Sequence, residues 1–469
     1  MNKQLVAGVD SSTQSVKIVV RDCETGELIR EAKAPHPDGT EIDPEIWWQA
    51  LGSIAPDVLD GVSAISISAQ QHGMVALDAQ AEVVRPALLW NDTRSAQAAL
   101  DLVTDLGGAD KWAQAVGSVP LAAFTVSKLR WMAEHEPENA AKTETVVLPH
   151  DYLTWLLAGK PSEFITDRGD ASGTGYWSPR EGAYRQDLVE MALGHELDVP
   201  RVAVPAEIVG YSELFGSSPI AIAPGTGDNM GAALALGVQP GDVVVSLGTS
   251  GTAYAGSLQG TADSSGLVAG FADATGNFLP LVCTLNAARI LSATAQLLRV
   301  DFDEFARLAR AAKPGSGGLT FLPYLDGERT PNLPHARGSL HGMTRENMTA
   351  ENIARSAIEG MFGGLSDAVQ ALTNLGVGVN RVIVIGGAAA NSAVLDVAAT
   401  MFDAPVEVPP AGEYVADGAA RQAAWALSEL DSPPVWDSLN PGITHRVDPI
   451  AVPEIRERYQ QVRKQAYSV

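Results

Sequence analysis

Short apolar stretches separated by polar turns open the chain. Each stretch is rich in β-branched residues or alternates apolar with polar side chains, a pattern typical of β-strands. A polar turn that carries Gly26 separates the second stretch from the third. The three stretches are residues 5–10, 15–22 and 27–35. The pattern therefore predicts a three-stranded meander at the start of the protein.

Helices and strands alternate along most of the remaining chain. Asp43 followed by Pro44 favours a helix over about 44–59, because aspartate caps helices and proline suits the first helical position. Residues 161–215 have no clear period and predict irregular structure with one short helix. The other expected elements are a buried strand ending at Gln70, helices over 95–160, 349–375 and 392–402, and a strand over 381–387. This alternation indicates α/β domains.

The opening pattern returns near the middle of the chain. Residues 238–256 again read as a strand, a loop of small residues and a second strand. Val9–Thr13 aligns with Val245–Thr249, which lies 236 residues later in a chain of 469. The shared order and the offset of about half the chain predict an internal duplication.

Charge and cysteine content exclude several classes of protein. The chain has 32 Lys and Arg against 56 Asp and Glu, a net charge of −24, which argues against binding to nucleic acid or to anionic lipid surfaces. The two cysteines, Cys23 and Cys283, have no metal-ligand spacing and favour a reduced, cytoplasmic protein. We expect no signal peptide and no membrane span, because no apolar run is long enough.

Phosphate binding would have to use an uncommon site, since neither the P-loop nor the dinucleotide fingerprint occurs. The small and hydroxylated loops 10–15 and 246–252 let backbone N–H groups approach phosphate oxygens. Asp10, at a strand end, can hold Mg²⁺ through water. The alternative for these loops is a plain polar hairpin turn. Gly386 and Gly387 suit a close approach to a base or ribose, or else form a simple strand-to-helix turn.

A glycine-rich segment at residues 225–231 opens a predicted helix and contains Asp228. This aspartate could be the N-cap of the helix. Alternatively, it could act as a general base beside a helix N-terminus, where anions bind well. An aspartate is a weak base, but phosphoryl transfer depends more on orienting the attacking hydroxyl than on removing its proton early.

Two polar clusters suggest a pocket for a polyol. Residues 70–73, QQHG, end a predicted strand, and ligands bind at strand ends in α/β sheets. Residues 89–94, LWNDTR, carry groups that can bond hydroxyls, and Trp90 can stack on a sugar face. His72 is as consistent with a structural histidine as with a ligand contact.

Seven motifs in this order resemble the FGGY family of sugar kinases, which has the actin-like, ribonuclease H-like ATPase fold. The resemblance covers residues 1–430, and segments within it are most similar to members that phosphorylate D-xylulose. The motifs lie at residues 10–13, 70–73, 90–94, 225–229, 246–252, 321–331 and 385–391. The resemblance implies two α/β domains related by internal duplication, with a cleft between them.

The resemblance also implies roles for individual residues. Asp228 would be the catalytic base that accepts the proton of the sugar 5-hydroxyl, and Asp10 would position Mg²⁺ and the γ-phosphate. The expected sugar-binding residues are Gln71, His72, Trp90, Asp228 and Asn229. The expected ATP-binding residues are Ser12, Thr13, Gly248, Thr249, Gly386, Gly387 and Asn391. Two positions depart from the family pattern, since Ser12 replaces the glycine of D-x-G-T and Gln71 replaces a common methionine.

The expected activity is ATP-dependent phosphorylation of D-xylulose to D-xylulose 5-phosphate, with Mg²⁺, in the cytoplasm. No nucleic-acid or membrane partner is expected, and a homodimer is left open. The expected domains are 1–238 for the sugar, the first phosphate loop and the catalytic aspartate, 239–430 for ATP, and 431–469 as a helical tail packed on the outside. The alternatives are a family member acting on L-ribulose, gluconate or glycerol, and, from other classes, an actin-like ATPase or a non-catalytic sugar-binding protein.

Overall fold

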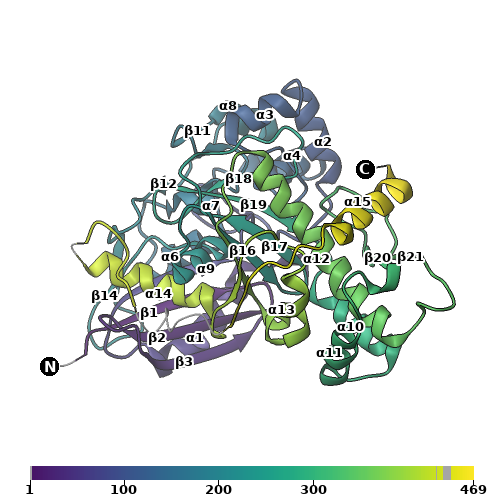
Figure 1. The fold of residues 1–469 in the computed structure, drawn as a ribbon. Coiled ribbons are helices and arrows are strands. Elements are labelled where there is room, and N and C mark those ends of the chain that lie inside the picture. The colour runs from purple at the N-terminus through teal and green to yellow at the C-terminus, as the bar shows by residue number, and fades with distance from the viewer. Residues whose placement is uncertain (1–2, 429, 437–444, 469) are drawn as a thin grey trace. The chain divides into compact units, whose positions relative to one another are not determined.

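The computed structural model describes residues 3–428, 430–436 and 445–468, which form two compact units (Figure 1). Unit 1 takes the described residues of 1–237, 258–279 and 412–440, and unit 2 takes those of 238–257, 280–411 and 441–469. None of the described helices combines the length and the apolar character that a membrane crossing needs.

Unit 1 is built on a mixed sheet whose strand order is β13-β14-β5-β1-β2-β3. The predicted meander is confirmed, because β1 pairs antiparallel with β2, and β2 with β3. On the other side, β5 pairs parallel with β1 and with β14, and β14 pairs antiparallel with β13. The strands are β1 Leu5–Ser11, β2 Ser15–Asp22, β3 Leu28–Pro35, β5 Val62–Ala69, β13 Gly210–Ser212 and β14 Ile220–Ile222; a short β15, Thr226–Gly227, extends the pairing with β5.

Unit 2 contains a sheet with the same pairing pattern, in the order β19-β17-β16-β22-β23-β24. Strands β16 and β17 form an antiparallel hairpin, β17 pairs antiparallel with β19, and β16 pairs parallel with β22. The strands are β16 Asp242–Leu247, β17 Gly251–Ala255, β19 Phe278–Thr284, β22 Arg381–Ile385, β23 Val406–Val408 and β24 His445–Val447. The hairpin β16–β17 matches β1–β2 at the predicted offset, so the predicted duplication is confirmed at the level of strand order.

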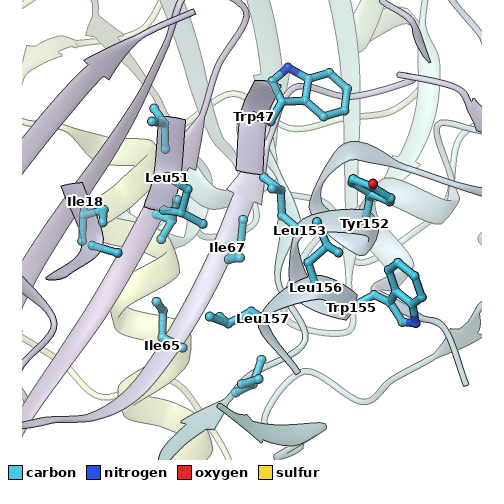
Figure 2. Packing of buried hydrophobic residues seen from close by; sticks show 14 of the residues in the cluster. Ile18, Trp47, Leu51, Ile65, Ile67, Tyr152, Leu153, Trp155, Leu156 and Leu157 are labelled. Atoms are coloured by element: carbon cyan, nitrogen blue, oxygen red, sulfur yellow. The ribbon is translucent and has the colours of Figure 1, made fainter. Parts of the chain in front are cut away.

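Helix α1, Pro44–Val58, begins where Asp43 predicts, and the Asp43 carboxylate accepts the N–H of Glu45 at 3.0 Å. Its Trp47 and Leu51 enter the main core of unit 1. Figure 2 shows strand residues Ile65 and Ile67 of this core near side chains of helix α6, Pro149–Leu157. Helix α6 thereby brings its first residues to the buried centre of unit 1.

Helix α14, Tyr414–Leu427, belongs to unit 1 although it comes late in the chain. It packs on β1 and on α9, Asp228–Leu236, through a face of small residues (Figure 1). Gly418 lies directly against Gly231, since a Cβ atom at 418 would overlap the Gly231 main chain. The structural units differ from the predicted domains 1–238 and 239–430, because 258–279 and the described residues of 412–440 belong to unit 1.

The predicted tail 431–469 is likewise shared between the units, with 437–444 and 469 outside the described residues. In unit 1, the buried indole of Trp436 donates to the carbonyl of Cys23 at 2.9 Å. In unit 2, helix α15, Pro453–Tyr467, buries Tyr459, whose hydroxyl lies 3.2 Å from that of Tyr324. The charged helix is therefore present, but one of its faces is packed into unit 2.

The remaining helices fill the connections. In unit 1 they are α2 Ala96–Asp105, α3 Ala109–Val116, α4 Thr125–His135, α5 Pro137–Lys142, α7 Arg168–Ala171 and α8 Gln186–Leu193. In unit 2 they are α10 Ala288–Leu298, α11 Phe302–Ala311, α12 Ala350–Asn374 and α13 Ser392–Ala398. Short strand pairs add β4 Glu41–Ile42 with β7 Ala87–Leu88, β6 Val75–Leu77 with β8 Thr145–Val147, β9 Ile165–Thr166 with β12 Arg201–Val202, β10 Trp177–Ser178 with β11 Ala183–Tyr184, and β20 Thr320–Leu322 with β21 Ser339–His341.

Candidate active site

The turn between β1 and β2 holds the carboxylate of Asp10 in a buried position. Ser12 donates its hydroxyl to an oxygen of Asp10 at 2.5 Å, and the Ser12 N–H donates to the carbonyl of Ser15 at 3.0 Å. Burial raises the pKa of Asp10 to about 6, and the hydrogen bond from Ser12 lowers it in part. The serine that stands in place of the expected glycine therefore helps to fix the orientation of Asp10.

Asp10 is the residue predicted to hold a divalent cation. The carboxylate is 4% exposed, and its negative charge raises the pKa of the nearby Asp228, so the site gathers negative charge that a cation would compensate. The described residues contain no group of three or more His, Cys, Asp or Glu arranged to hold a metal. Mg²⁺ suits such a place, because it binds few protein oxygens and keeps several waters.

The side chain of Thr13 joins three of the predicted segments. The indole N–H of Trp90 donates to the Thr13 hydroxyl at 2.9 Å. The same hydroxyl donates to the Oε1 of Gln70 at 3.3 Å. The structure thus brings together three predicted segments around Thr13: the loop 10–15, the QQHG segment 70–73 and the WNDTR segment 90–94.

Asp228 is the first residue of helix α9, and Gly227 occupies the N-cap position, so the N-cap alternative for Asp228 is wrong. The main-chain N–H and the side-chain amide of Asn229 both donate to one Asp228 oxygen, each at 2.7 Å. Burial and the charge of Asp10 raise the pKa of Asp228 to about 7, although the bonds from Asn229 lower it. Asp228 remains partly exposed, so a substrate can reach it.

Gln71 extends this arrangement toward the predicted sugar site. Its Oε1 accepts the side-chain amide of Asn229 at 3.2 Å. Gln71 also packs on Gly227, where a Cβ atom would lie 2.8 Å from the Gln71 Cγ. Gln71, Asn229 and Asp228 therefore form one connected row of polar groups.

The ring of His72 is fixed from several sides. Its Nδ1 lies 2.7 Å from the carbonyl oxygen of Gly173, and since a carbonyl only accepts, Nδ1 carries the proton. The ring packs against Phe124 and Phe271, with centroids 4.9 Å and 5.6 Å away. The His72 ring is packed as in a structural histidine, and its orientation is fixed as a ligand contact would need. This geometry is therefore consistent with both interpretations of His72.

A buried lysine holds the backbone of His72. The Lys128 ammonium donates to the His72 carbonyl at 2.6 Å, and His72 has a left-handed backbone, with φ 66°. Burial lowers the pKa of Lys128 to about 7, and the charge of Asp92 opposes this. A strained backbone held by a buried cation is typical of a functional position.

The WNDTR segment is more internally bonded than the sequence suggests. Asp92 accepts the hydroxyl of Thr40 at 2.8 Å and the Nε of Arg94 at 2.9 Å. Arg94 also bonds Glu41 at 2.7 Å. These groups stabilise the loop, and Trp90 is the member of the segment that bonds the Thr13 turn.

Sequence reasoning missed one segment of this region, residues 167–173. Residues 161–215 were expected to hold irregular structure with one short helix. Within them Arg168–Ala171 forms the short helix α7, and Gly173 after it supplies the carbonyl that fixes His72. Sequence reasoning also missed His150, which is buried against Asp170 at 2.7 Å. The sequence offered one signal for this segment, the aspartates at 167 and 170 among small residues. An aspartate that is buried is seldom left without a partner.

In unit 2, the predicted nucleotide residues follow two neighbouring parallel strands. Gly248 and Thr249 lie in the turn after β16, and Gly386 follows β22. Gly386 has φ 96°, and a Cβ atom there would lie 2.6 Å from the carbonyl oxygen of Leu247. Only glycine suits that position, which lets the two strand ends approach closely.

Gly387 opens a short 3-10 helix, Gly387–Ala390, and Asn391 follows it. The Asn391 side chain caps helix α13 by accepting the N–H of Ala393 at 3.0 Å. Asn391 therefore has a structural bond in addition to its predicted place near the adenosine.

The predicted site residues of unit 1 thus gather at one edge of their sheet. They are Asp10, Ser12, Thr13, Gln71, His72, Trp90, Asp228 and Asn229. This edge is formed by the carboxyl ends of β1 and β5, and β15 leads into Asp228 beside them. Ligands bind at such strand ends in open α/β sheets.

Several known carbohydrate kinases are similar to this chain. A xylulose kinase of Streptomyces coelicolor is 46% identical over 441 residues, covering 91% of this chain and 89% of its own. The crystal structure of a xylulose kinase from Bifidobacterium adolescentis has 42% identity and a TM-score of 0.89, covering 99% of this chain and 100% of that one. A Plasmodium falciparum glycerol kinase, at 18% identity and a TM-score of 0.87 over 99% of this chain and 98% of its own, shares the fold.

Family models agree with these relatives. The N-terminal domain of the FGGY family of carbohydrate kinases matches residues 5–235, and its C-terminal domain matches 243–427. Both models match in order and together cover most of the chain. This protein belongs to the FGGY family of carbohydrate kinases.

Proposed function

We propose that this kinase transfers the γ-phosphate of ATP to the 5-hydroxyl of D-xylulose, forming D-xylulose 5-phosphate and ADP. The observation that carries the proposal is the partly exposed Asp228, whose pKa is raised to about 7 at the end of a row of sugar-suited polar groups. The names of the relatives at 46% and 42% identity support xylulose as the acceptor.

In this proposal Asp228 orients the sugar hydroxyl and accepts its proton as the hydroxyl attacks the γ-phosphate. A base with a pKa near the working pH is well matched to this task. Asn229 holds one oxygen of the carboxylate at 2.7 Å, which fixes its direction. Phosphoryl transfer depends chiefly on such positioning and on charge stabilisation.

Asp10 would hold Mg²⁺ through water, and Ser12 keeps the Asp10 carboxylate in one orientation. When bound, Mg²⁺ would neutralise charge on the phosphates of ATP. In unit 1 the Thr13 N–H would be offered to a phosphate, since the Ser12 N–H already donates to Ser15. In unit 2 the Gly248–Thr249 turn and the loop at Gly386–Gly387 would supply N–H groups to the nucleotide. Because the chain is acidic, we propose that ATP binding rests on these local groups.

Gln71 is the position that bears most on the choice of sugar. Its amide replaces a methionine common in the family and is linked to Asn229. An amide can bond one more hydroxyl than a thioether can, so L-ribulose, gluconate and glycerol remain the competing acceptors. A cytoplasmic location and a homodimer remain predictions.

A panel of acceptors tests the proposal. ADP release should be measured with D-xylulose, L-ribulose, gluconate and glycerol at saturating Mg²⁺-ATP. We expect the highest kcat/KM for D-xylulose, because the relatives at 46% and 42% identity are named xylulose kinases. A higher kcat/KM for any of the other three would reassign the substrate, and no turnover above water with all four would contradict the kinase proposal.

The pH dependence of kcat/KM should report Asp228. The carboxylate must be unprotonated to accept a proton, so activity should fall about tenfold for each pH unit below its pKa. We expect this limb close to pH 7, and somewhat lower where Mg²⁺ offsets the charge of Asp10. A limb centred near pH 4, the ordinary value for aspartate, would contradict a base whose pKa is raised by burial.

A further inference from the structure

Four ionisable side chains are buried together in unit 1. His150, Asp151, Asp167 and Asp170 are each at most 3% exposed. The His150 Nδ1 lies 2.7 Å from an Asp170 oxygen, and its Nε2 lies 3.1 Å from Asp151 and 3.9 Å from Asp167. Burying charges costs free energy even when they are paired, so stability alone does not account for such a cluster.

A cationic His150 matches this geometry. The Nδ1 hydrogen-bonds to Asp170, whereas the Nε2 lies 3.1 Å from Asp151 without forming a hydrogen bond among the described residues. Three carboxylates within 3.9 Å of the ring nitrogens favour a positive charge on the imidazole. Burial lowers the pKa of His150, but the charges of Asp151 and Asp170 outweigh this effect and raise it to about 9. The cation therefore compensates part of the negative charge of its neighbours.

The cluster is bonded to the segment that carries the proposed base. Asp167 caps helix α7 and accepts the hydroxyl of Thr226 at 2.8 Å, two residues before Asp228. The His150 ring also packs on Gly225, where a Cβ atom would lie 2.6 Å from its Cδ2. The cluster thus contacts the chain segment that leads into Asp228 at two residues, Thr226 and Gly225.

The cluster also adjoins the proposed sugar residues. Burial raises the pKa of Asp170, and the neighbouring Gln71 amide is one of the groups that lower it. Gly173, three residues further on, accepts the Nδ1–H of His72. The charge of Asp170 in turn contributes to the raised pKa of Asp228.

We propose that His150 is a positioning residue of this kinase. Its cation holds Asp151 and Asp170, and so fixes the turn formed by residues 167–173. That turn then holds the proposed sugar contacts and the start of helix α9. The inference rests on the proposed sugar kinase function and assigns His150 no contact with substrate.

The test compares His150→Gln with His150→Lys. Glutamine removes the positive charge that faces the three carboxylates, so we expect the KM for D-xylulose to rise about tenfold or more and kcat to fall at least tenfold. The KM for ATP should stay within twofold, because most of the proposed nucleotide residues, among them Gly248, Thr249 and Gly386, lie in unit 2. Lysine keeps a cation and should restore most of the loss.

Two further variants separate positioning from folding. Arg355→Gln breaks a comparably buried ion pair in unit 2, where Arg355 Nε lies 2.7 Å from Glu359, and should lower stability without changing the sugar KM. Thr226→Val removes only the hydroxyl bonded to Asp167 and should raise the sugar KM several-fold. Thr226→Val decides the matter if His150→Gln does not fold.

The outcomes are distinct. A sugar KM and kcat within twofold of the native enzyme for His150→Gln, or for Thr226→Val where it decides, would overturn the inference. A fall in kcat that follows the loss of folded protein, with an unchanged sugar KM, would also overturn it and leave a structural role. Absence of turnover in the native enzyme with every sugar would refute the proposed function itself, and the inference with it.

Discussion

Replacing Asp228 with asparagine is expected to lower kcat by about 10³-fold while the chain still folds. The amide oxygen can still accept both donors of Asn229, which lie 2.7 Å from the native carboxylate. What it cannot do is take the proton of the sugar hydroxyl. ADP release with D-xylulose measures the loss, and a kcat within tenfold of the native value would exclude Asp228 as the base.

The same variant should be more stable than the native chain at alkaline pH. Because the pKa of Asp228 is raised, the folded state binds more protons than the unfolded state between about pH 4 and pH 7. Native stability therefore falls as pH rises through this window, and Asp228→Asn avoids that loss. Without ligands or Mg²⁺, we expect a gain of up to about 4 kcal/mol at pH 8 and none at pH 4.

Thermal or urea unfolding at the two pH values measures this difference. Equal stability of both proteins at pH 8 would mean that the carboxylate carries no strain from burial or from Asp10. Loss of activity together with a gain of stability would instead identify a side chain that is kept for chemistry, at the expense of the folded state.

Gly418→Ala is expected to destabilise unit 1 by at least about 3 kcal/mol. Its Cβ atom would overlap the main chain of Gly231, and backbone atoms in a helix cannot move aside alone. Helices α14 and α9 would have to separate, and α9 begins at Asp228. Activity should therefore fall together with stability, although alanine is the better helix former by about 1 kcal/mol.

Gly52→Ala is the matched control for this substitution. Gly52 also lies within a helix, α1, but a Cβ atom there would meet no atom within 4 Å. We expect Gly52→Ala to stabilise the chain by roughly 0.5–1 kcal/mol. Urea unfolding compares the two, and an equal effect for both would contradict the close packing of α14 on α9.

Local signals in the sequence predicted much of this architecture. Asp43 and Pro44 marked the start of α1, because capping depends on adjacent residues. The pair of hairpins at 5–22 and 242–255 could be aligned, because strand alternation and small-residue loops repeat within short windows. Both features depend on neighbours in the chain.

Tertiary features were not predictable in the same way. The packing of Gly418 on Gly231 joins positions almost two hundred residues apart, so nothing near either glycine marks it. The hydrogen bond of His150 to Asp170, and its proximity to Asp167, depend on how α6 meets the 167–173 turn. Asp228 looked as suited to an N-cap as to a base, and the structure excludes the cap because Gly227 occupies the N-cap position of α9.

The identity of the phosphorylated product tests the central claim most directly. ATP, Mg²⁺ and D-xylulose should be incubated with the native enzyme and with Asp228→Asn, and the products examined by phosphorus and carbon NMR. The account predicts one ADP for each sugar consumed, with phosphate on the oxygen of carbon 5, and almost no product from the variant. ADP and inorganic phosphate without a sugar phosphate, or phosphate on another carbon, would contradict it.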